Sequence, residues 1–333
     1  MLLAVDGGAT KTIAVVYDSS IVGVGVAGSG NYNNVGVEKA RENTGKAVSD
    51  AIRMAKGDWK DIDRAIYGFA GVENSASTTR SVETFLRSIH RNGTFTLFND
   101  GVAAYYLSTR GRPGVVAAAG TGSVVQARNG ERAVRTGGWG WLAGDEGGAF
   151  YISRRGLQEA AKSFDGRNSD TMLVHAFENA CGGDFQAAVN SIYTSFAVNT
   201  VASYAPLVTE CARKGDRIAL EVCSEAATEL ASAVKAAVRR VAFSGEFIIG
   251  GLGGVFRAGS VITDTFRSEL SEEGGIFART FYGYHVVLGS VMLDMKNRGY
   301  EAGERDVEKL VSEMDSMLLR VPKQERKEFL FMD

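Results

Sequence analysis

The residues near the N-terminus best suited to chemistry form a glycine turn that carries charged and hydroxyl side chains. Asp6-Gly7-Gly8 is followed by Thr10 and Lys11 and lies between two β-branched runs. Two glycines in a tight turn let backbone N–H groups face an anion, and Thr10 and Lys11 add a hydroxyl and a positive charge. A carboxylate at Asp6 suits such a place if it holds a hydrated Mg²⁺, which keeps several of its waters. A plain β-hairpin with a Gly-Gly turn would give the same pattern.

A second glycine turn repeats this logic further along the chain. Gly120-Thr121-Gly122-Ser123 again places two glycines and two hydroxyl groups between strand-like runs. One such turn indicates little. Two of them, at the same place in each half of a repeated order of elements, predict a pair of loops that grip one polyphosphate.

Two other nucleotide-binding patterns are excluded by their context. Residues 23–28 match GxGxxG, but they lie inside an alternating strand and do not open a helix directly after one, as a dinucleotide fingerprint must. The P-loop pattern GxxxxGK followed by Ser or Thr does not occur anywhere in the sequence. The two glycine turns are therefore the candidates for phosphate binding.

The elements that must position these turns follow one order twice. Periodicity predicts three strands, a helix, a strand, a helix, a strand and a helix. In the first half the expected ranges are 2–5, 12–17, 21–27, 37–56, 65–70, 75–90, 95–98 and 101–108. After a crossover at 110–114, the second half is expected at 115–119, 123–127, 132–136, a long helical stretch at 146–243, 247–249, 257–271 and 285–297.

Bulk properties place the chain among ordinary soluble globular proteins. A length of 333 residues favours two domains, and the net charge of −2 offers no surface for nucleic acid or an anionic membrane. The cysteines Cys181, Cys211 and Cys223 lack the spacing of a disulfide framework or a zinc site. No signal peptide and no apolar run of about 20 residues is apparent, so a cytoplasmic location without membrane partners is expected.

Seven motifs together resemble the sugar kinase/actin/heat-shock-chaperone superfamily, and within it the N-acetylglucosamine kinase-like group, the BadF/BadG/BcrA/BcrD ATPase family. They occur in family order from residue 5 to about 295, and the GGWG…GDEG block is the most specific. The motifs are VDGGATKT (5–12), SGNYNNVG (29–36), GFAGV (68–72), FND (98–100), AAGTGS (118–123), GGWGWLAGDEGGAFYIS (137–153) and GGLGGVF (250–256).

This resemblance implies a two-lobed α/β fold of the ribonuclease H-like, actin-like ATPase type, with a duplicated βββαβαβα topology and a nucleotide cleft between the lobes. The N-terminal lobe would comprise residues 1–110 and the C-terminal helices at about 289–333, and would carry the first phosphate turn, a sugar loop and the catalytic aspartate. The C-terminal lobe, 111–288, would carry the second turn, the GGWG/GDEG block and the adenosine site.

The resemblance also implies transfer of the γ-phosphoryl group of Mg-ATP to a sugar hydroxyl, with Asp100 as the catalytic base. A carboxylate at the C-terminal tip of a strand suits that task, although Asp100 could instead cap the helix 101–108. The implied phosphate and Mg²⁺ residues are those of the two turns, with Asp6 on Mg²⁺ through water. The implied adenosine site is Gly250, Gly251, Gly253 and Gly254, which a simple strand-to-helix turn would also explain.

The sugar site implied by the resemblance is built mostly from loops. Amides both donate to and accept from hydroxyls, although an ordinary surface loop would carry the same asparagines. One of two carboxylates after Gly144 would cap a helix while the other faces sugar, and the tryptophans could be core aromatics. The residues are Asn31, Asn33, Gly71, Asp100, Gly138, Trp139, Asp145 and Glu146. His90, His175 and His285 are isolated and are expected on the surface or satisfied in the core.

Rival functions lack their own signatures. An ATPase that activates a dehydratase or reductase would carry a [4Fe–4S] cluster cysteine directly before AAGTG, where this chain has Val116-Ala117. An actin-like or chaperone-like switch lacks the GGWG…GDEG block, and the zinc cysteines of the repressor/ORF/kinase family are absent. The acceptor stays open between N-acetylglucosamine, a hexose such as glucose, and 2-keto-3-deoxygluconate, whose carboxylate Arg135 could meet. A homodimer is expected because relatives commonly form one.

Overall fold

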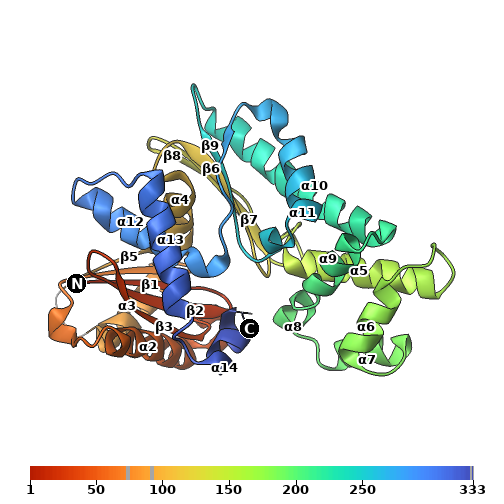
Figure 1. The fold of residues 1–333 in the computed structure, drawn as a ribbon, viewed down its shortest axis with the longest axis horizontal. Coiled ribbons are helices and arrows are strands. Elements are labelled where there is room, and N and C mark those ends of the chain that lie inside the picture. Colours follow the sequence, from red (N-terminus) through yellow and green to blue (C-terminus); the bar gives the residue numbers. More distant parts are fainter. Residues whose placement is uncertain (73–75, 91–93, 331, 333) are drawn as a thin grey trace. The chain divides into compact units, whose positions relative to one another are not determined.

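The computed structural model describes residues 1–72, 76–90, 94–330 and 332. The chain divides into two compact units, which Figure 1 draws in colours that follow the sequence. Unit 1 comprises Met1–Gly111 and Tyr284–Asp333, and unit 2 comprises Arg112–Gly283. The C-terminal helices thus return to the unit that the N-terminus begins.

Unit 1 is built on a five-stranded sheet of order β3-β2-β1-β4-β5. The first three strands are antiparallel neighbours, whereas β4 and β5 run parallel to β1. Its strands are β1 (Leu2–Gly7), β2 (Lys11–Tyr17), β3 (Ile21–Gly28), β4 (Arg64–Phe69) and β5 (Phe95–Asn99). Its helices are α1 (Tyr32–Val35), α2 (Val37–Met54), α3 (Ala76–Ile89), α4 (Asp100–Thr109), α12 (Val287–Asn297), α13 (Glu304–Leu318) and α14 (Lys323–Glu325).

Apolar residues on both faces of this sheet are buried because helices cover each of them. One face packs against α2 and α3, and the other against α4 and α12. The glycines of the GxGxxG match lie within β3, where a Cβ atom at Gly25 would lie 1.9 Å from the carbonyl oxygen of Ala47 on α2. Glycine there lets the helix lie directly on the strand, which confirms that this motif is not a nucleotide fingerprint.

Unit 2 repeats the same topology. Its sheet has the order β10-β9-β6-β7-β8, with β6, β7 and β8 antiparallel and with β9 and β10 parallel to β6. Its strands are β6 (Gly114–Ala119), β7 (Ser123–Asn129), β8 (Arg132–Gly137), β9 (Ile248–Leu252) and β10 (Ile276–Phe277). Its helices are α5 (Ala149–Phe164), α6 (Leu173–Cys181), α7 (Phe185–Thr194), α8 (Val198–Ala202), α9 (Ala205–Arg213), α10 (Arg217–Val241) and α11 (Ser260–Glu269). The predicted duplication of topology is confirmed.

Several predicted elements need correction. The helical stretch expected over 146–243 is six helices, α5 to α10, interrupted at points such as Gly182-Gly183 and Gly215, where positive φ angles end a helix. The two-residue strand β10 was not predicted, because so short an edge strand carries no alternation. Residue 75 of the expected helix 75–90 lies outside the described residues. Among the described helices, none is long and apolar enough to cross a membrane.

Candidate functional site

The first glycine turn (residues 7–11, the Gly8 turn) joins β1 to β2 and is closed by its own backbone. The N–H of Gly8 donates to the carbonyl oxygen of Lys11 at 2.9 Å, so this N–H is used inside the turn. The carbonyl of Gly8 accepts from the N–H of Gly30 at 3.2 Å and from the hydroxyl of Ser29 at 3.2 Å. The turn is therefore fastened to the loop that follows β3.

Asp6 occupies the penultimate position of β1 and is only 6% exposed. Its register partner on β4 is Gly68, whose own partner on β5 is Phe98. A Cβ atom at Gly68 would lie 3.6 Å from the Cα of Asp100, so glycine keeps the space beside Asp6 and Asp100 clear of a side chain. Two carboxylates thus come together at the carboxyl ends of parallel strands, where open α/β sheets bind ligands.

Burial raises the pKa of the Asp6 carboxyl well above its usual range, because a buried carboxylate loses its hydration. The negative charge of Asp100 raises it further, while the ammonium group of Lys11 opposes the shift. A carboxylate in this situation gains from a nearby cation. Among the described residues no group of three or more His, Cys, Asp or Glu side chains is arranged to hold a metal. The single buried carboxylate of Asp6 suits Mg²⁺ held mainly by water and phosphate, with one protein carboxylate.

Asp100 does not cap α4. The N-cap is Asn99, whose Oδ1 accepts from the N–H of Gly101 at 3.0 Å, and Asp100 is the first helical residue. The amide of Asn99 also donates to the carbonyl oxygen of Val72 at 2.9 Å. Asn99 therefore ties the start of α4 to the GFAGV loop, where Gly71 has a φ of 87°. The alternative that Asp100 serves as the helix cap is wrong.

The predicted sugar loop of unit 1 is shaped by its asparagines. Asn31 is the N-cap of α1 and its Oδ1 accepts from the N–H of Asn33 at 3.0 Å. Asn34, which the sequence prediction did not single out, donates from Nδ2 to the carbonyl oxygen of Ala9 at 3.0 Å. That contact fixes the loop to the Gly8 turn. A run of three asparagines in four residues was the available signal for such a role.

The second glycine turn (residues 120–123, the Gly120 turn) joins β6 to β7 in unit 2. As in the Gly8 turn, one glycine N–H is used internally: Gly120 donates to the carbonyl oxygen of Gly122 at 2.9 Å. Its carbonyl groups meet the start of α5, because Ala149 donates to Gly120 at 2.8 Å and Phe150 donates to Thr121 at 3.0 Å. The turn and the helix N-terminus therefore form one piece of backbone.

The GGWG…GDEG segment (residues 138–146, the acceptor block) lies against this turn. The hydroxyl of Ser123 donates to the carbonyl oxygen of Glu146 at 2.5 Å. Asp145 has a φ of 60° and its Oδ1 accepts from the N–H of Gly140 at 3.1 Å. Helix α5 begins only at Ala149 with Gly148 as an N-cap that offers no side chain. The prediction that Asp145 or Glu146 opens and caps a helix is therefore wrong.

Burial is the main reason that the pKa of the Asp145 carboxyl is raised. The backbone N–H of Gly140 acts in the opposite direction, Glu146 raises the pKa, and Arg135 and the backbone N–H of Ser123 lower it. The carboxylate thus accepts a backbone hydrogen bond within the acceptor block and lies against Gly122 of the Gly120 turn.

Aromatic and basic side chains mark the outer part of the acceptor block. Trp139 is 76% exposed, so it is not a core residue. The guanidinium of Arg135 lies 5.8 Å from the Trp139 ring centroid and donates to the carbonyl oxygens of Gly137 and Gly138. Trp141 instead packs against Phe150, with ring centroids 5.4 Å apart. An exposed, oriented indole is a surface on which a sugar ring can stack.

The glycines predicted to meet adenosine divide into two pairs. Gly250 and Gly251 lie inside β9 and are buried, so they belong to the strand and not to a turn after it. Gly253 follows the strand with a φ of 117°, and a Cβ atom there would lie 2.2 Å from the carbonyl oxygen of Ala119. Gly254 begins the turn into the next helix, and a Cβ atom there would meet nothing within 4 Å. Open space for a ligand is found at Gly254.

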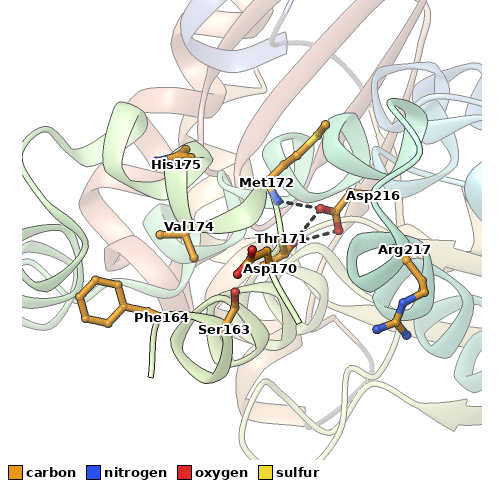
Figure 2. Close-up of a pocket in the computed structure, with 9 residues that line it drawn as sticks. All are labelled: Ser163, Phe164, Asp170, Thr171, Met172, Val174, His175, Asp216 and Arg217. Atoms are coloured by element: carbon orange, nitrogen blue, oxygen red, sulfur yellow. Dashed lines mark hydrogen bonds between the residues drawn. The ribbon is translucent and has the colours of Figure 1, made fainter. Parts of the chain in front are cut away.

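A separate cavity of about 640 Å³ lies among the helices of unit 2, away from every predicted site residue. Figure 2 shows Asp216 pointing toward Thr171 and Met172, and its carboxylate accepts from the Thr171 hydroxyl at 2.9 Å and the Met172 N–H at 2.7 Å. Asp216 also caps α10. The carboxylate oxygens of Asp216 therefore accept hydrogen bonds within the protein, and they hold the segment at Thr171 against the start of α10. The lining residues are Ser163, Phe164, Asp170, Thr171, Met172, Val174, His175, Asp216 and Arg217.

The histidines lie apart from these residues, as predicted. His285 is 3% exposed and its Nε2 lies 2.9 Å from Oδ1 of Asp315. His175 lies on the surface beside Glu178, with 2.7 Å between Nδ1 and Oε2. His90 meets the hydroxyl of Tyr67 at 3.3 Å.

Comparison with known proteins places these features in a family. The model of the BadF/BadG/BcrA/BcrD ATPase family matches residues 3–293. The N-acetylmuramic acid/N-acetylglucosamine kinase of Clostridium acetobutylicum is 27% identical over 276 residues, covering 81% of this chain and 90% of that protein. The N-acetyl-D-glucosamine kinase of Dictyostelium discoideum is 24% identical over 292 residues, covering 82% and 90%. A candidate N-acetylglucosamine kinase structure from Chromobacterium violaceum shares the fold, with a TM-score of 0.71 at 23% identity over 88% of this chain and 98% of that one.

Proposed function

Because the chain belongs to the BadF/BadG/BcrA/BcrD ATPase family, we propose that it is an ATP-dependent sugar kinase. The observation that supports this most directly is the pair of carboxylates Asp6 and Asp100 in unit 1, at the ends of two parallel strands. The chain also aligns over four-fifths of its length with two kinases of N-acetylated amino sugars. An N-acetylhexosamine is therefore the first acceptor to test.

Asp100 is the proposed catalytic base. As the acceptor oxygen attacks the γ-phosphorus of ATP, its proton passes to the Asp100 carboxylate and the bond from the γ-phosphorus to the β–γ bridging oxygen breaks, releasing ADP. Asn99 supplies the helix cap, so Asp100 is not committed to that role. General base catalysis of this kind contributes about 10²–10⁴-fold to a rate.

The two glycine turns are the proposed phosphate sites. Asp6 would hold Mg²⁺ through water, since its buried carboxylate beside Asp100 gains from a cation. When bound, Mg²⁺ supplies neutralisation of the charge that develops on the transferring phosphoryl group. Backbone and side chains of Gly7, Gly8, Thr10, Lys11, Gly120, Thr121, Gly122 and Ser123 orient the phosphates.

The adenosine and sugar sites follow the same reasoning. Gly253 and Gly254 let the chain approach the adenosine, and Gly250 and Gly251 support them from within β9. Trp139 offers an exposed ring face to the sugar. The other proposed sugar contacts are Asn31, Asn33, Gly71, Gly138, Asp145 and Glu146.

The proposal is tested by coupled ADP release with Mg-ATP and a panel of acceptors. The panel is N-acetylglucosamine, N-acetylmuramic acid, glucose and 2-keto-3-deoxygluconate. We expect turnover on an N-acetylated amino sugar, and a fall in kcat of about 10²–10⁴-fold in Asp100→Asn. Asp18→Asn, on the exposed turn between β2 and β3, is the matched control and keeps wild-type kcat. ATP hydrolysis that no sugar accelerates would contradict the proposal.

A further inference from the structure

The Gly120 turn and the acceptor block are joined by contacts that converge on one side chain. Besides accepting from Gly140 at 3.1 Å, the Asp145 carboxylate lies against Gly122 in the turn, and the Ser123 hydroxyl of the turn donates to the carbonyl oxygen of the neighbouring Glu146 at 2.5 Å. A Cβ atom at Gly122 would lie 2.0 Å from Oδ2 of Asp145, so only glycine lets the carboxylate reach the turn. Asp145 therefore touches both the proposed phosphate site and the proposed sugar site.

The acceptor block has little regular structure to hold it in place. It contains no helix or strand, and Gly138 and Gly140 have φ angles of 72° and 88°. Asp145 itself has a φ of 60°, in the left-handed region that residues with a side chain adopt only uncommonly. A strained residue persists only where its surroundings over-determine it. Here the surroundings are the N–H of Gly140 and the backbone of Gly122.

We propose that Asp145 is a positioning residue that couples the two ligand sites of unit 2, so that phosphate binding at the Gly120 turn and sugar binding at the acceptor block strengthen each other. This inference rests on the proposed function, and it assigns Asp145 a role beyond any contact with sugar.

The physical basis is an ordering cost that two ligands share. A nucleotide that fixes the Gly120 turn holds Gly122 against the Asp145 carboxylate and the Ser123 hydroxyl on the carbonyl oxygen of Glu146. Asp145 in turn holds the N–H of Gly140. The sugar then meets a block that is already ordered and does not bear that cost itself. Coupling of this kind is reciprocal, so sugar must raise nucleotide affinity by the same factor.

Calorimetric titration measures the coupling directly. The dissociation constant of N-acetylglucosamine, or of whichever acceptor the panel selects, is measured with and without the β,γ-imido analogue of ATP and MgCl₂. In the wild type we expect the analogue to tighten sugar binding by about fivefold or more. In Asp145→Ala the ratio falls below about twofold, whatever the absolute affinity, whereas Asp145→Asn keeps most of it because its amide oxygen still accepts from the N–H of Gly140 and its side chain still fills the space against Gly122. Asp264→Asn, an exposed aspartate of α11, is the control and keeps the wild-type ratio.

Hydrogen exchange gives a second readout that needs no sugar. The analogue alone should slow amide exchange across residues 138–148 in the wild type and in Asp145→Asn, but not in Asp145→Ala. If the analogue does not change the amide exchange rate of residues 138–148 in the wild type, the coupling proposal is overturned. The proposal is also overturned if the analogue slows exchange in Asp145→Ala as much as in the wild type. These outcomes are distinct from failure of the kinase proposal, which would appear as no turnover on any acceptor while the nucleotide-dependent protection persists.

Discussion

The Gly8 turn and the Gly120 turn occupy the same place in two copies of one topology, yet they are equipped differently. In each, a glycine donates its N–H to a carbonyl oxygen of the same turn: Gly8 to Lys11, and Gly120 to Gly122. The penultimate residue of the preceding strand is Asp6 in unit 1, opposite Gly68, and Ala118 in unit 2, opposite Leu252. Unit 1 adds Asp100 after its fifth strand, whereas unit 2 has Ala278 after β10. The duplicated scaffold supplies two glycine turns, and only unit 1 carries carboxylates at these two positions of the scaffold.

The largest effect on activity should come from a substitution that makes unit 1 resemble unit 2 by removing the carboxylate of Asp6. Asp6→Asn removes the carboxylate proposed for Mg²⁺, and we expect kcat/KM to fall at least about 100-fold because charge neutralisation supplies several kcal/mol. The same substitution should raise the melting temperature by about 2 °C or more at pH 7, since it removes a buried charge. Steady-state kinetics and calorimetry on one preparation measure both changes.

The pH dependence of the free energy of unfolding explains why Asp6→Asn is expected to stabilise the protein at pH 7. The folded pKa of Asp6 lies above its ordinary value of 3.8, so folded protein holds this proton to a higher pH than the unfolded chain does. The free energy of unfolding therefore falls as the pH rises from about 3.8 through the folded pKa. In Asp6→Asn this decrease in the free energy of unfolding with rising pH should be absent. A variant that is both less active and less stable at pH 7 would show that Asp6 serves structure.

The next effect concerns the contact between β9 and β6 in unit 2. Gly253→Ala places a Cβ atom 2.2 Å from the carbonyl oxygen of Ala119 at a φ of 117°. We expect a loss of about 3 kcal/mol in the free energy of unfolding, from clash and strain together. Gly274→Ala is the matched control, because its φ is 74° but a Cβ atom there meets nothing within 4 Å. It should cost only roughly 1–2 kcal/mol. Equal losses in the two variants would mean that the close approach at Gly253 is relaxed in solution.

The sequence predicted most of the scaffold because its signals are local. Alternating β-branched runs separated by glycine turns located nine of the ten strands in the described part of the chain, and the repeated order predicted the duplicated topology. The misleading GxGxxG match was rejected because Gly23 and Gly25 sit within an alternating strand, and the structure shows what they do there: they let α2 approach. The two-residue β10 carries too few residues for any periodicity to be visible.

What could not be predicted depends on contacts between segments distant in sequence. Asp145 followed a glycine and preceded a helical pattern, so an N-cap was the natural expectation. Its carboxylate instead accepts from the N–H of Gly140 and lies against Gly122, in the turn before β7. Likewise, the sequence did not show which of two adjacent residues caps α4. The cap is Asn99, and Asp100 is the first residue of the helix. The site roles themselves stay predictions until the variants are measured.

A moderate effect is expected from Asn99, which has no counterpart in unit 2. Asn99→Ala removes both the cap of α4 and the bond to the carbonyl oxygen of Val72. Loss of a cap costs about 1 kcal/mol, and a misplaced Asp100 should lower kcat by roughly tenfold with less change in KM. Asn99→Asp keeps the cap acceptor but not the donor to Val72, so it should recover stability more than kcat. Full recovery of kcat in that variant would show that the contact with the GFAGV loop is dispensable.

The smallest effect should come from the exposed indole of the acceptor block. Trp139→Ala removes a side chain that is 76% exposed, so the melting temperature should stay within about 1 °C of the wild type. If the ring stacks on the acceptor, the KM for sugar should rise by about three- to tenfold while the KM for ATP and kcat change little. Trp139→Phe should recover part of the loss because an aromatic face remains. Trp141→Ala is the contrast: its ring packs on Phe150 and Phe196, so we expect it to lower stability first. A KM for sugar that is unchanged in Trp139→Ala would remove this residue from the proposed sugar site and leave the polar residues of the block to bind the acceptor.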